Sequence, residues 1–550
     1  MKPLLLLILD GWGVAPQSKS NAITQAQLPF YNSLLSTYPH GILQASGEAV
    51  GLPKGEVGNT ETGHLNIGAG YVVHQDLVRI NYSIANGTFF KNKAFLDAIN
   101  HARKYESNLH LIGMVGSAGV HSNIEHLLAL LQLLKEQSYS NVFLHLITDG
   151  RDSSPKSSLL YLDQVQSFLV SIGFGKIATI MGRYYAMDRD YRWERTRLAY
   201  LALTSHSAEK AVSYLEAVNE SYRKSLTDEF ILPSIIYENN IPLPRIKNYD
   251  SAIFFNFRID RPRQLTKAFI LEDFQAQAND EDYDPFAVKY YKKHLVRIQK
   301  TEHPFRRGKK PEHLFFVTMT EYSQKFHVSA VAYPPEIVAH PIGEAIAKYG
   351  LPQLRMAESE KERFVTYYFN GQREVPFLLE ERLIIPSPKV ATYDLTPEMS
   401  VVELTDTLIK KKKEKKYHFI VANFANPDMV AHTGNLEATI KACESVDQCL
   451  SKLIPVVLHQ GGTMIITGDH GNAEELINSK TEGMDTEHST YPVPLIIVNS
   501  KLEGKNVILS EGILGDVAPT VLAMMHIEKP AEMKGRNLLA NSLHSKLKED

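Results

Sequence analysis

The stretch Leu4-Leu5-Leu6-Leu7-Ile8-Leu9-Asp10 decides the fold class of this chain. Six consecutive apolar residues fit a strand that is buried on both faces, and the run stops at a carboxylate. Apolar runs of strand length recur, with helix-like segments between them, at 109–115, 143–148, 177–181, 252–257, 314–319, 419–424, 464–467 and 495–498. Continuous apolar strands that alternate with helices predict parallel sheets covered on both faces, so we expect an α/β fold.

The composition is that of an ordinary folded protein. The chain has 550 residues, of which 44% are hydrophobic and 22% charged, and this length allows two or more domains. The formal net charge of -3 argues against non-specific binding of nucleic acid, which requires a basic face. The two cysteines, Cys443 and Cys449, make no disulfide framework and fit a reducing compartment.

The apolar N-terminal run resembles a signal peptide only superficially. The run is short, and Asp10-Gly11-Trp12 ends it without a cleavage-like site. No later apolar run has the length of a membrane span. We therefore expect a cytoplasmic protein.

Residues with chemical potential fall into two groups. The first group comes from both ends of the chain and comprises Asp10, Thr60, Asp428, His432, Asp469, His470 and His488. The second group is rich in arginine and occupies the middle, in motifs at 119–122, 149–152, 182–189 and 256–261. Most of these motifs follow a predicted strand, at the edge where open α/β sheets bind ligands. The simplest architecture is an outer domain of residues 1–74 and 337–550 with an inner domain, 75–336, inserted into it.

The first group predicts a metal site. Asp428 and His432 are four residues apart, so on a helix they would share one face. Asp10, Asp469-His470 and His488 each lie beside the end of a predicted strand. Each residue alone could be a helix cap or a surface histidine, but together they suffice for two divalent cations. Oxygen and nitrogen ligands without cysteine favour Mn²⁺ or Zn²⁺ over Ca²⁺, and we expect Mn²⁺.

Two charged segments stand apart from these motifs. Residues 272–284 are acidic and residues 289–310 are basic, and a second basic run follows at 410–416. Charge blocks of this kind are typical of solvated surface segments, although a binding role for 272–310 is an alternative.

The motifs together resemble one enzyme family nearly from end to end. They lie at 9–13, 47–53, 58–70, 148–152, 181–189, 423–434, 467–474 and 487–489. In this order they resemble the cofactor-independent (2,3-bisphosphoglycerate-independent) phosphoglycerate mutases of the alkaline phosphatase superfamily. The resemblance implies an alkaline-phosphatase-like metal domain, a second α/β substrate domain inserted into it, and interconversion of 3-phosphoglycerate and 2-phosphoglycerate in glycolysis and gluconeogenesis.

The same resemblance implies roles for individual residues. One metal ion would be held by Asp428, His432 and His488, and the other by Asp10, Asp469, His470 and the hydroxyl of Thr60. The substrate-binding residues would be His121, Arg151, Asp152, Arg183, Arg189, Arg258, Arg261 and Lys361. Lys361 would contact the substrate phosphate, and Asp152, helped by His121, would act as general acid and base. The family also implies a monomer that acts on a small molecule.

The arginines suit a substrate that carries both a phosphate and a carboxylate. A single arginine is as well explained by a surface ion pair, but five that follow strand ends are not. Guanidinium groups bind such anions with a bidentate geometry that lysine cannot match.

The nucleophile position departs from the family pattern. The family has Gly-Asn-Ser-Glu-x-Gly-His, whereas this chain has Gly58-Asn59-Thr60-Glu61-Thr62-Gly63-His64. Threonine carries the same hydroxyl with an added methyl group that stiffens the side chain. We expect Thr60 rather than Thr62 to form a phosphothreonine. The charged segment at 272–310 is also longer than the family implies.

Two other functions stay open on the sequence alone. The first is a two-metal phosphohydrolase that acts on another phosphoester, since the outer domain by itself would allow it. The second is a phosphoglycerate-binding protein without turnover, if threonine has disabled the nucleophile.

Overall fold

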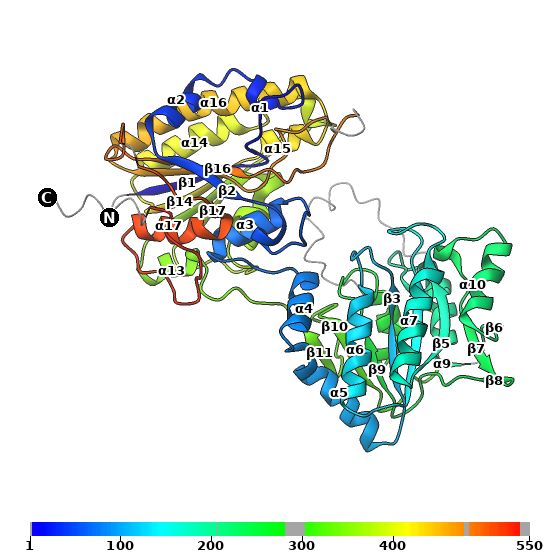
Figure 1. Ribbon diagram of the computed structural model, residues 1–550. Coiled ribbons are helices and arrows are strands. Elements are labelled where there is room, and N and C mark those ends of the chain that lie inside the picture. The colour runs from blue at the N-terminus through cyan, green and yellow to red at the C-terminus, as the bar shows by residue number, and fades with distance from the viewer. Residues whose placement is uncertain (1–2, 206, 281–302, 478–482, 506, 540–550) are drawn as a thin grey trace. The chain divides into compact units, whose positions relative to one another are not determined.

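The computed structural model describes residues 3–205, 207–280, 303–477, 483–505 and 507–539. The chain divides into two compact units, each with its own sheet (Figure 1). The outer unit consists of Met1–Gln75 and Ile337–Asp550, and the inner unit is the continuous segment Asp76–Glu336. Most of the charged segment at 272–310, residues 281–302, lies outside the described residues.

An eight-stranded sheet forms the centre of the outer unit. Its strands, in spatial order, are β13 (Glu380–Ile385), β12 (Gln353–Glu358), β14 (Phe419–Phe424), β1 (Leu4–Leu9), β15 (Thr463–Gly468), β16 (Val493–Val498), β2 (His40–Gln44) and β17 (Gly512–Ile513). β1 is parallel to both of its neighbours, and Leu9 lies opposite Phe424 of β14 and Gly468 of β15. The carboxyl ends of these three strands therefore meet at one edge of the sheet.

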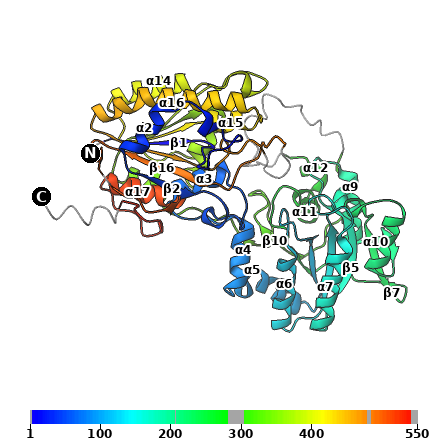
Figure 2. The ribbon, with the colours of Figure 1, turned by 45° about the horizontal axis from the view of Figure 1, so that its top comes forward.

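Strand β1 is apolar throughout because both of its faces are covered. Its odd-numbered side chains belong to a core that also contains residues of α14 (Val401–Lys413) and α16 (Leu436–His459). Its even-numbered side chains belong to a second core, with α17 (Val517–Met524) and α13 (Ile342–Lys348). Figure 2 shows α14 and α16 on one side of β1, with α17 on the other. The alternation along one strand thus fixes two helical layers.

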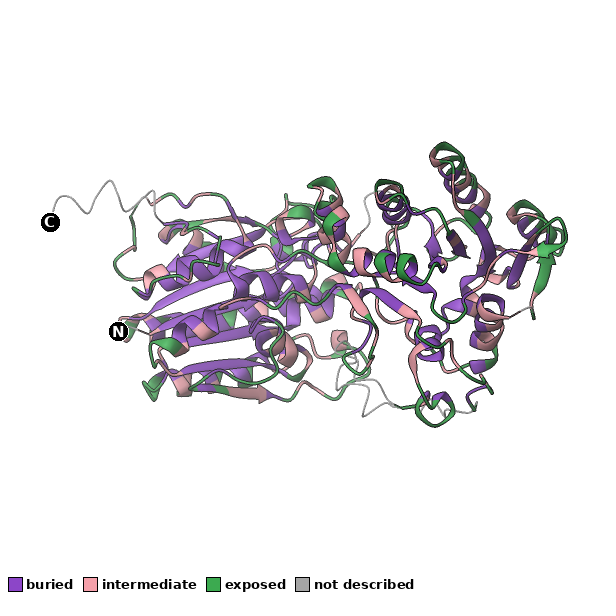
Figure 3. Cartoon of the chain, turned by 90° about the horizontal axis from the view of Figure 1, so that it is seen from below, coloured by how far each residue is buried: buried purple, intermediate pink, exposed green. Residues whose placement is uncertain are grey.

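A nine-stranded sheet forms the centre of the inner unit. Its strands, in spatial order, are β11 (Ala330–Tyr333), β10 (Phe315–Thr320), β9 (Ser251–Phe254), β3 (Leu109–Val115), β4 (Val142–Thr148), β5 (Lys176–Gly182), β7 (Ser234–Glu238) and β6 (Glu209–Ala211), and β8 (Ile241–Pro242) pairs with β7. The described residues of this unit form three apolar clusters: one contains Leu111, the second contains Met114, and a smaller one contains Ala178. In Figure 3 the strands of both units are mostly buried, whereas exposed positions are concentrated on helices and loops.

The remaining helices connect these strands. In the outer unit they are α1 (Ala22–Gln25), α2 (Pro29–Thr37), α3 (Thr60–Ala69) and α15 (Asn426–Ala431). In the inner unit they are α4 (Asp76–Ala85), α5 (Lys93–Lys104), α6 (Ile124–Glu136), α7 (Ser158–Ile172), α8 (Arg183–Ala186), α9 (Trp193–Thr204), α10 (Tyr214–Arg223), α11 (Arg263–Ile270) and α12 (Phe274–Gln277). Within the described part of the chain, every helix falls short of the length and apolar character needed to cross a bilayer.

The α/β class is confirmed, and the prediction of parallel sheets holds for most but not all strand pairs. β16 runs antiparallel to β15, and β7 runs antiparallel to β5. Antiparallel neighbours can be connected at one edge of the sheet, so β15 and β16 need no crossover helix. The segment between them consists of residues 469–492. That segment carries His470 and His488, so the antiparallel return keeps both histidines at the same edge.

Candidate functional site

The acidic residues of the outer unit converge where three parallel strands end. Asp10 directly follows β1, and Asp469 directly follows β15. Asp428 lies on α15, which begins two residues after β14. All three side chains are at most 1% exposed. The strand register therefore brings Asp10 together with two carboxylates that lie more than 400 residues later in the sequence.

Three histidines complete this cluster. His488 Nε2 lies 3.1 Å from His432 Nε2, and both atoms lie 3.4 Å from Asp428 Oδ1. His470 Nε2 lies 3.5 Å from Asp10 Oδ1 and 3.6 Å from Asp469 Oδ2. The six carboxylate and imidazole ligands that the sequence predicts are thus brought together, with His470 in contact with both predicted sets.

The orientation of the histidines suits metal binding. The Nδ1 atoms of His432, His470 and His488 lie 2.9, 3.2 and 2.8 Å from the backbone carbonyls of Thr486, Gly471 and Gly58. A carbonyl only accepts hydrogen bonds, so each Nδ1 carries a proton and each Nε2 faces the carboxylates. Burial lowers the pKa of His470, but the carboxylates outweigh it and raise that pKa to about 10, so a bound cation would take the place of the proton on its Nε2. This arrangement, with one ring nitrogen fixed by a backbone acceptor, is the usual one for histidines that bind metals.

The donor atoms also fit divalent cations. Two sets of three ligand atoms each lie within 4.8 Å of one another, one from Asp428, His470 and His488 and one from Asp10, Asp469 and His470. Asp469 Oδ2 is buried, and it lies 3.2 Å from His64 Nδ1 and 3.6 Å from His470 Nε2. Burial raises the pKa of Asp469, but His470 and His64 outweigh it and lower that pKa to about 2, so the carboxylate is ionised. Ionised oxygen donors beside imidazole nitrogens suit Mn²⁺ or Zn²⁺.

Thr60 is the first residue of α3 and points into the cluster. Its Oγ1 lies 2.9 Å from His470 Nε2 and accepts a hydrogen bond of 3.1 Å from Lys361 Nζ. The hydroxyl of Thr62 instead contacts Asn59, at 3.1 Å from Oδ1 and 3.2 Å from the carbonyl oxygen. Asn59 is the N-cap of α3, so Thr62 is engaged in the cap while Thr60 faces the predicted ligands.

Lys361 supplies a positive charge within the cluster. It lies in a short 3₁₀ helix, Ser359–Lys361, and is only 3% exposed. Its Nζ donates to Asp10 Oδ1 at 2.7 Å and to Asp428 Oδ2 at 2.6 Å. Burial lowers the pKa of Lys361, but the nearby carboxylates outweigh it and raise that pKa above its ordinary value. The ammonium group is therefore charged and reaches the Thr60 hydroxyl.

Three polar residues that the sequence analysis left without a role hold the carboxylates. Asn423 donates to Asp10 Oδ2 at 2.6 Å, and Asn472 donates to Asp428 Oδ1 at 2.8 Å. His64 Nδ1 lies 3.2 Å from Asp469 Oδ2. The signal that could have found them is their position inside the motifs at 58–70, 423–434 and 467–474.

The inner unit carries a separate cluster of charged residues at the ends of its strands. Arg183 follows β5, is 2% exposed, and donates from Nη1 to Asp149 Oδ1 and Asp152 Oδ2, both at 2.5 Å. His121 Nε2 lies 3.6 Å from the same Asp152 oxygen. The predicted acid–base pair and one predicted arginine therefore lie in contact.

A second carboxylate organises the other predicted arginines. Asp260 Oδ2 accepts from Arg189 Nη1 at 2.8 Å, and Asp260 Oδ1 lies 3.5 Å from Arg258 Nε and 3.7 Å from His121 Nδ1. The guanidinium of Arg261 donates to the carbonyl oxygen of Met187 at 3.2 Å. Asp149 and Asp260 thus position the cations, a role that the sequence analysis did not assign to them.

Arg151 differs from the other arginines of this cluster. Its side chain is 55% exposed, and its nearest ion pair is with Glu229 at 3.7 Å. Its guanidinium is close enough to Arg261 to contribute to lowering the Arg261 pKa, after the larger effects of burial, Arg183 and Arg189. It therefore lies at the exposed margin of the group rather than in its buried part.

The protonation states of the acid–base pair follow from burial and charge. Burial and the neighbouring Arg183 lower the pKa of His121 to about 4, so the ring is neutral at pH 7. Burial raises the pKa of Asp152, but the hydrogen bond from Arg183 outweighs it and lowers that pKa below its ordinary value. In this state Asp152 is a carboxylate, so it can accept a proton but has none to donate.

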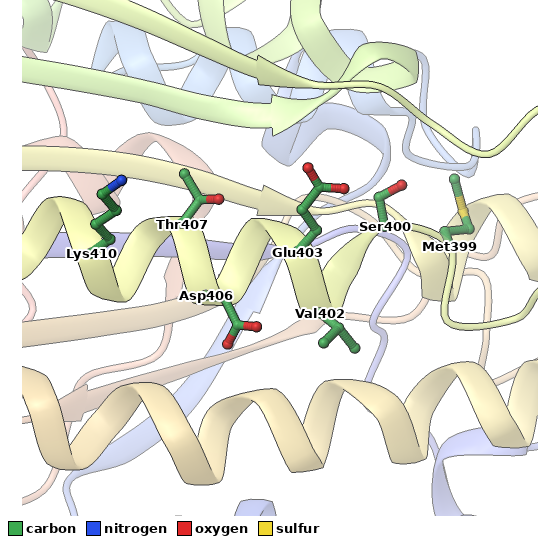
Figure 4. Close-up of a pocket in the computed structure, with 7 residues that line it drawn as sticks. All are labelled: Met399, Ser400, Val402, Glu403, Asp406, Thr407 and Lys410. Atoms are coloured by element: carbon green, nitrogen blue, oxygen red, sulfur yellow. The ribbon is translucent and has the colours of Figure 1, made fainter.

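A surface cavity of about 550 Å³ lies along α14 of the outer unit. Figure 4 shows Glu403 and Lys410 on one side of this helix and Val402 and Asp406 on the other. None of the predicted site residues lines the cavity, so we assign it no part in the chemistry.

Comparisons with known proteins decide the family. A family model described as "BPG-independent PGAM N-terminus" matches residues 80–324. A 2,3-bisphosphoglycerate-independent phosphoglycerate mutase of Clostridium perfringens (strain SM101 / Type A) is 47% identical over 538 residues, which cover 98% of this chain and 99% of that protein. The chain belongs to the 2,3-bisphosphoglycerate-independent phosphoglycerate mutases. The expected resemblance is thereby confirmed, and the chain is an enzyme of the isomerase class.

Further members of the mutase family match over the same length. The mutase of Moorella thermoacetica (strain ATCC 39073 / JCM 9320) is 47% identical and covers 98% of both chains. A crystal structure of Leishmania mexicana phosphoglycerate mutase, determined at low cobalt concentration, is 26% identical and covers 98% of this chain and 97% of that chain, with a TM-score of 0.57. The mutase fold therefore extends over both units.

Proposed function

We propose that this enzyme interconverts 3-phosphoglycerate and 2-phosphoglycerate without 2,3-bisphosphoglycerate, through a phosphothreonine at Thr60. The observation that carries the proposal is the environment of Thr60 Oγ1, which lies 2.9 Å from His470 Nε2 and 3.1 Å from Lys361 Nζ within a cluster of three buried carboxylates. A hydroxyl in such a setting is a nucleophile for phosphoryl transfer.

Two divalent cations, which we propose to be Mn²⁺, would be held in the outer unit. Asp428, His432 and His488 would hold one, and Asp10, Asp469, His470 and the Thr60 oxygen the other. When bound, such cations lower the pKa of the hydroxyl and neutralise charge on the phosphoryl oxygens. The buried, ionised carboxylates and the inward Nε2 atoms of the histidines support this assignment.

In the first half of the reaction, Thr60 releases its hydroxyl proton to solvent, and the deprotonated Oγ1 attacks the phosphorus atom of the bound phosphoglycerate. The bond between phosphorus and the glycerate oxygen breaks, and the phosphoryl group passes to Thr60. Lys361, whose ammonium group is 3.1 Å from Oγ1, stabilises the negative charge that builds up on the transferred group.

The inner unit would handle the protons and hold the glycerate. The oxygen that loses the phosphoryl group must gain a proton, and the hydroxyl that later receives the group must lose one. Asp152, ionised beside Arg183, takes the proton from the hydroxyl that will receive the phosphoryl group and passes it to the glycerate oxygen that has lost the group. One proton thus moves within the substrate through Asp152, which His121 assists from 3.6 Å. The arginines hold the glycerate by its carboxylate while it turns.

The return of the phosphoryl group to the other oxygen completes the isomerisation. The proposal requires both clusters to act on one substrate molecule, with water kept out, because water would release phosphate from phosphothreonine instead. A cytoplasmic monomer with no macromolecular partner is part of the same proposal, by analogy with the family's small-molecule chemistry.

The first experiment compares four proteins, each stripped of metal and reloaded with Mn²⁺, in a mutase assay without 2,3-bisphosphoglycerate. Wild type, Thr60→Ser and Thr62→Ala should turn over 3-phosphoglycerate, and Thr60→Ala should lose at least about 10³-fold in kcat, because its nucleophile is gone. Phosphothreonine on residue 60, detected by mass spectrometry after rapid quenching, would support the intermediate directly.

The same assay separates the alternatives. Release of inorganic phosphate in place of 2-phosphoglycerate would favour a phosphohydrolase. Loss of activity in Thr62→Ala with full activity in Thr60→Ala would move the nucleophile by two residues. If the wild-type protein has no mutase activity and Thr60→Ser has activity, the threonine has disabled turnover.

A further inference from the structure

Glu474 joins three segments of the outer unit that each carry predicted metal ligands. The residue is 1% exposed. Its Oε2 accepts hydrogen bonds of 2.9 Å from the backbone N–H groups of Gly13 and Asn472. Its Oε1 accepts a hydrogen bond from Ser489 Oγ. One carboxylate is therefore bonded to three separate points of the chain, all through uncharged donors.

Each of these points lies next to a predicted ligand. Gly13 is three residues after Asp10, Asn472 is two residues after His470, and Ser489 directly follows His488. The Ser489 N–H also donates to the Gly471 carbonyl at 3.0 Å, which ties two of the segments together a second time. The side chain of Asn472 continues the network to Asp428 Oδ1.

Two glycines allow the backbone to approach this carboxylate. A Cβ atom at Gly13 would lie 2.2 to 2.4 Å from the carboxylate atoms of Glu474. A Cβ atom at Gly471 would lie 2.2 Å from Glu474 Oε1 and 2.3 Å from Ser489 Oγ. Both positions exclude any side chain, so the three segments pack directly around the carboxylate.

We propose that Glu474 is a positioning residue that holds the segments of Asp10, His470 and His488 in the geometry that binds metal. The inference rests on the two-metal site of the proposed function. Glu474 itself does not reach the cluster through any contact described above; it acts through the backbone and Ser489. Outer residues that orient metal ligands change metal affinity by about 10- to 100-fold when they are removed.

Two variants distinguish positioning from an effect of the negative charge. Glu474→Ala removes every acceptor and frees the three segments. Glu474→Gln removes the charge but keeps one oxygen for the two N–H groups, and its amide can donate to Ser489 Oγ, since a hydroxyl also accepts. If positioning is the role, the glutamine variant retains most of the affinity that the alanine variant loses.

The experiment measures Mn²⁺ binding to the metal-free, full-length protein by isothermal titration calorimetry, together with kcat and KM. Glu474→Ala should weaken Mn²⁺ binding by about 10- to 100-fold. Glu474→Gln should lose less than about tenfold, the size of one altered hydrogen bond. At saturating Mn²⁺ the KM for phosphoglycerate should stay unchanged, because the arginines belong to the inner unit. The matched control is Glu475→Ala, at the neighbouring partly exposed residue, which should bind Mn²⁺ like wild type.

The possible outcomes separate this inference from the proposed function. Wild-type Mn²⁺ affinity in Glu474→Ala would overturn the inference alone, and so would an equal loss in the alanine and glutamine variants, which would assign the effect to charge. A wild type that binds no Mn²⁺ would overturn the metal site and the inference with it. If Glu474→Ala fails to fold, Ser489→Ala, which removes one donor only, should still weaken binding, and unchanged affinity there would count against positioning.

Discussion

At the scale of single residues, this site depends on carboxylates that hold other side chains. Asp149 and Asp260 bind the arginines of the inner unit, and Glu474 binds the loops of the outer unit. Their charge is stabilised by cations or by backbone donors, so they are costly to remove even though the proposed mechanism gives them no reacting atom.

Replacing Asp260 with asparagine should weaken substrate binding more than it slows turnover. The change keeps the shape of the side chain but removes the charge that pairs with Arg189 and lies 3.5 Å from Arg258. Charge-assisted hydrogen bonds contribute about 1.5–3 kcal/mol, so KM for phosphoglycerate should rise about 10- to 100-fold. Steady-state kinetics would test this, with Asp190→Asn, at an exposed pair with Arg192, as the control. A fall in kcat at constant KM would contradict it.

At the scale of helices and strands, buried acids also join neighbouring elements. Glu358 ends β12 and is 1% exposed, and its Oε1 accepts a hydrogen bond of 3.0 Å from the N–H of Ser400, just before α14. Burial raises the pKa of Glu358 to about 7, although the Ser400 hydrogen bond acts to lower it. The end of β12 is therefore linked to α14 by a carboxyl group that titrates near neutral pH.

This raised pKa predicts a pH dependence of stability. Between the unfolded pKa of 4.5 and the folded pKa of about 7, the native state binds more protons than the unfolded state. The contribution of Glu358 to the free energy of unfolding should therefore be highest below pH 4.5. It should fall by up to about 3 kcal/mol as the pH rises to 7.

Urea unfolding of the metal-free protein, followed at pH 5 and pH 8, would measure this effect. All other titrating groups are common to wild type and Glu358→Gln, so the difference between the two proteins isolates the Glu358 contribution. The stability of wild type relative to the glutamine variant should decrease from pH 5 to pH 8. A constant difference would show that Glu358 is ionised in the folded protein over this range.

At the scale of the whole molecule, one continuous segment forms a unit inside another. The chain leaves the outer unit after Gln75 and re-enters it at Ile337. The inner unit has its own nine-stranded sheet and its own apolar clusters. Such a segment contains the interactions needed to fold by itself.

The isolated fragment 76–336 should therefore fold and bind phosphoglycerate without metal. We expect a cooperative thermal transition by circular dichroism and heat of binding in calorimetry with 3-phosphoglycerate, because the arginine cluster lies entirely within the fragment. Binding should weaken with rising salt concentration, as it does for anions held by charge. An unfolded fragment would show that the inner unit requires the outer unit in order to fold. A folded fragment that does not bind 3-phosphoglycerate would show that the substrate-binding residues lie elsewhere.

The sequence by itself predicted most strands that are apolar over their whole length. The runs that begin near Leu4, Leu109 and Phe419 correspond to β1, β3 and β14, because a strand buried on both faces must be apolar at every position. Short or partly exposed strands such as β2 and β13 lack this pattern and were not predicted. The predicted ligands also came from sequence, because acidic residues and histidines at strand ends are a local feature.

Only the tertiary structure decided the strand directions and the supporting contacts. No local pattern shows that β16 turns back beside β15, since an apolar run has the same composition in either direction. Nor does one show that Glu474 meets Gly13, which is 461 residues away. The residue type alone determines what chemistry a side chain can perform. The partner of a buried carboxylate depends instead on which strands become neighbours in the folded sheet.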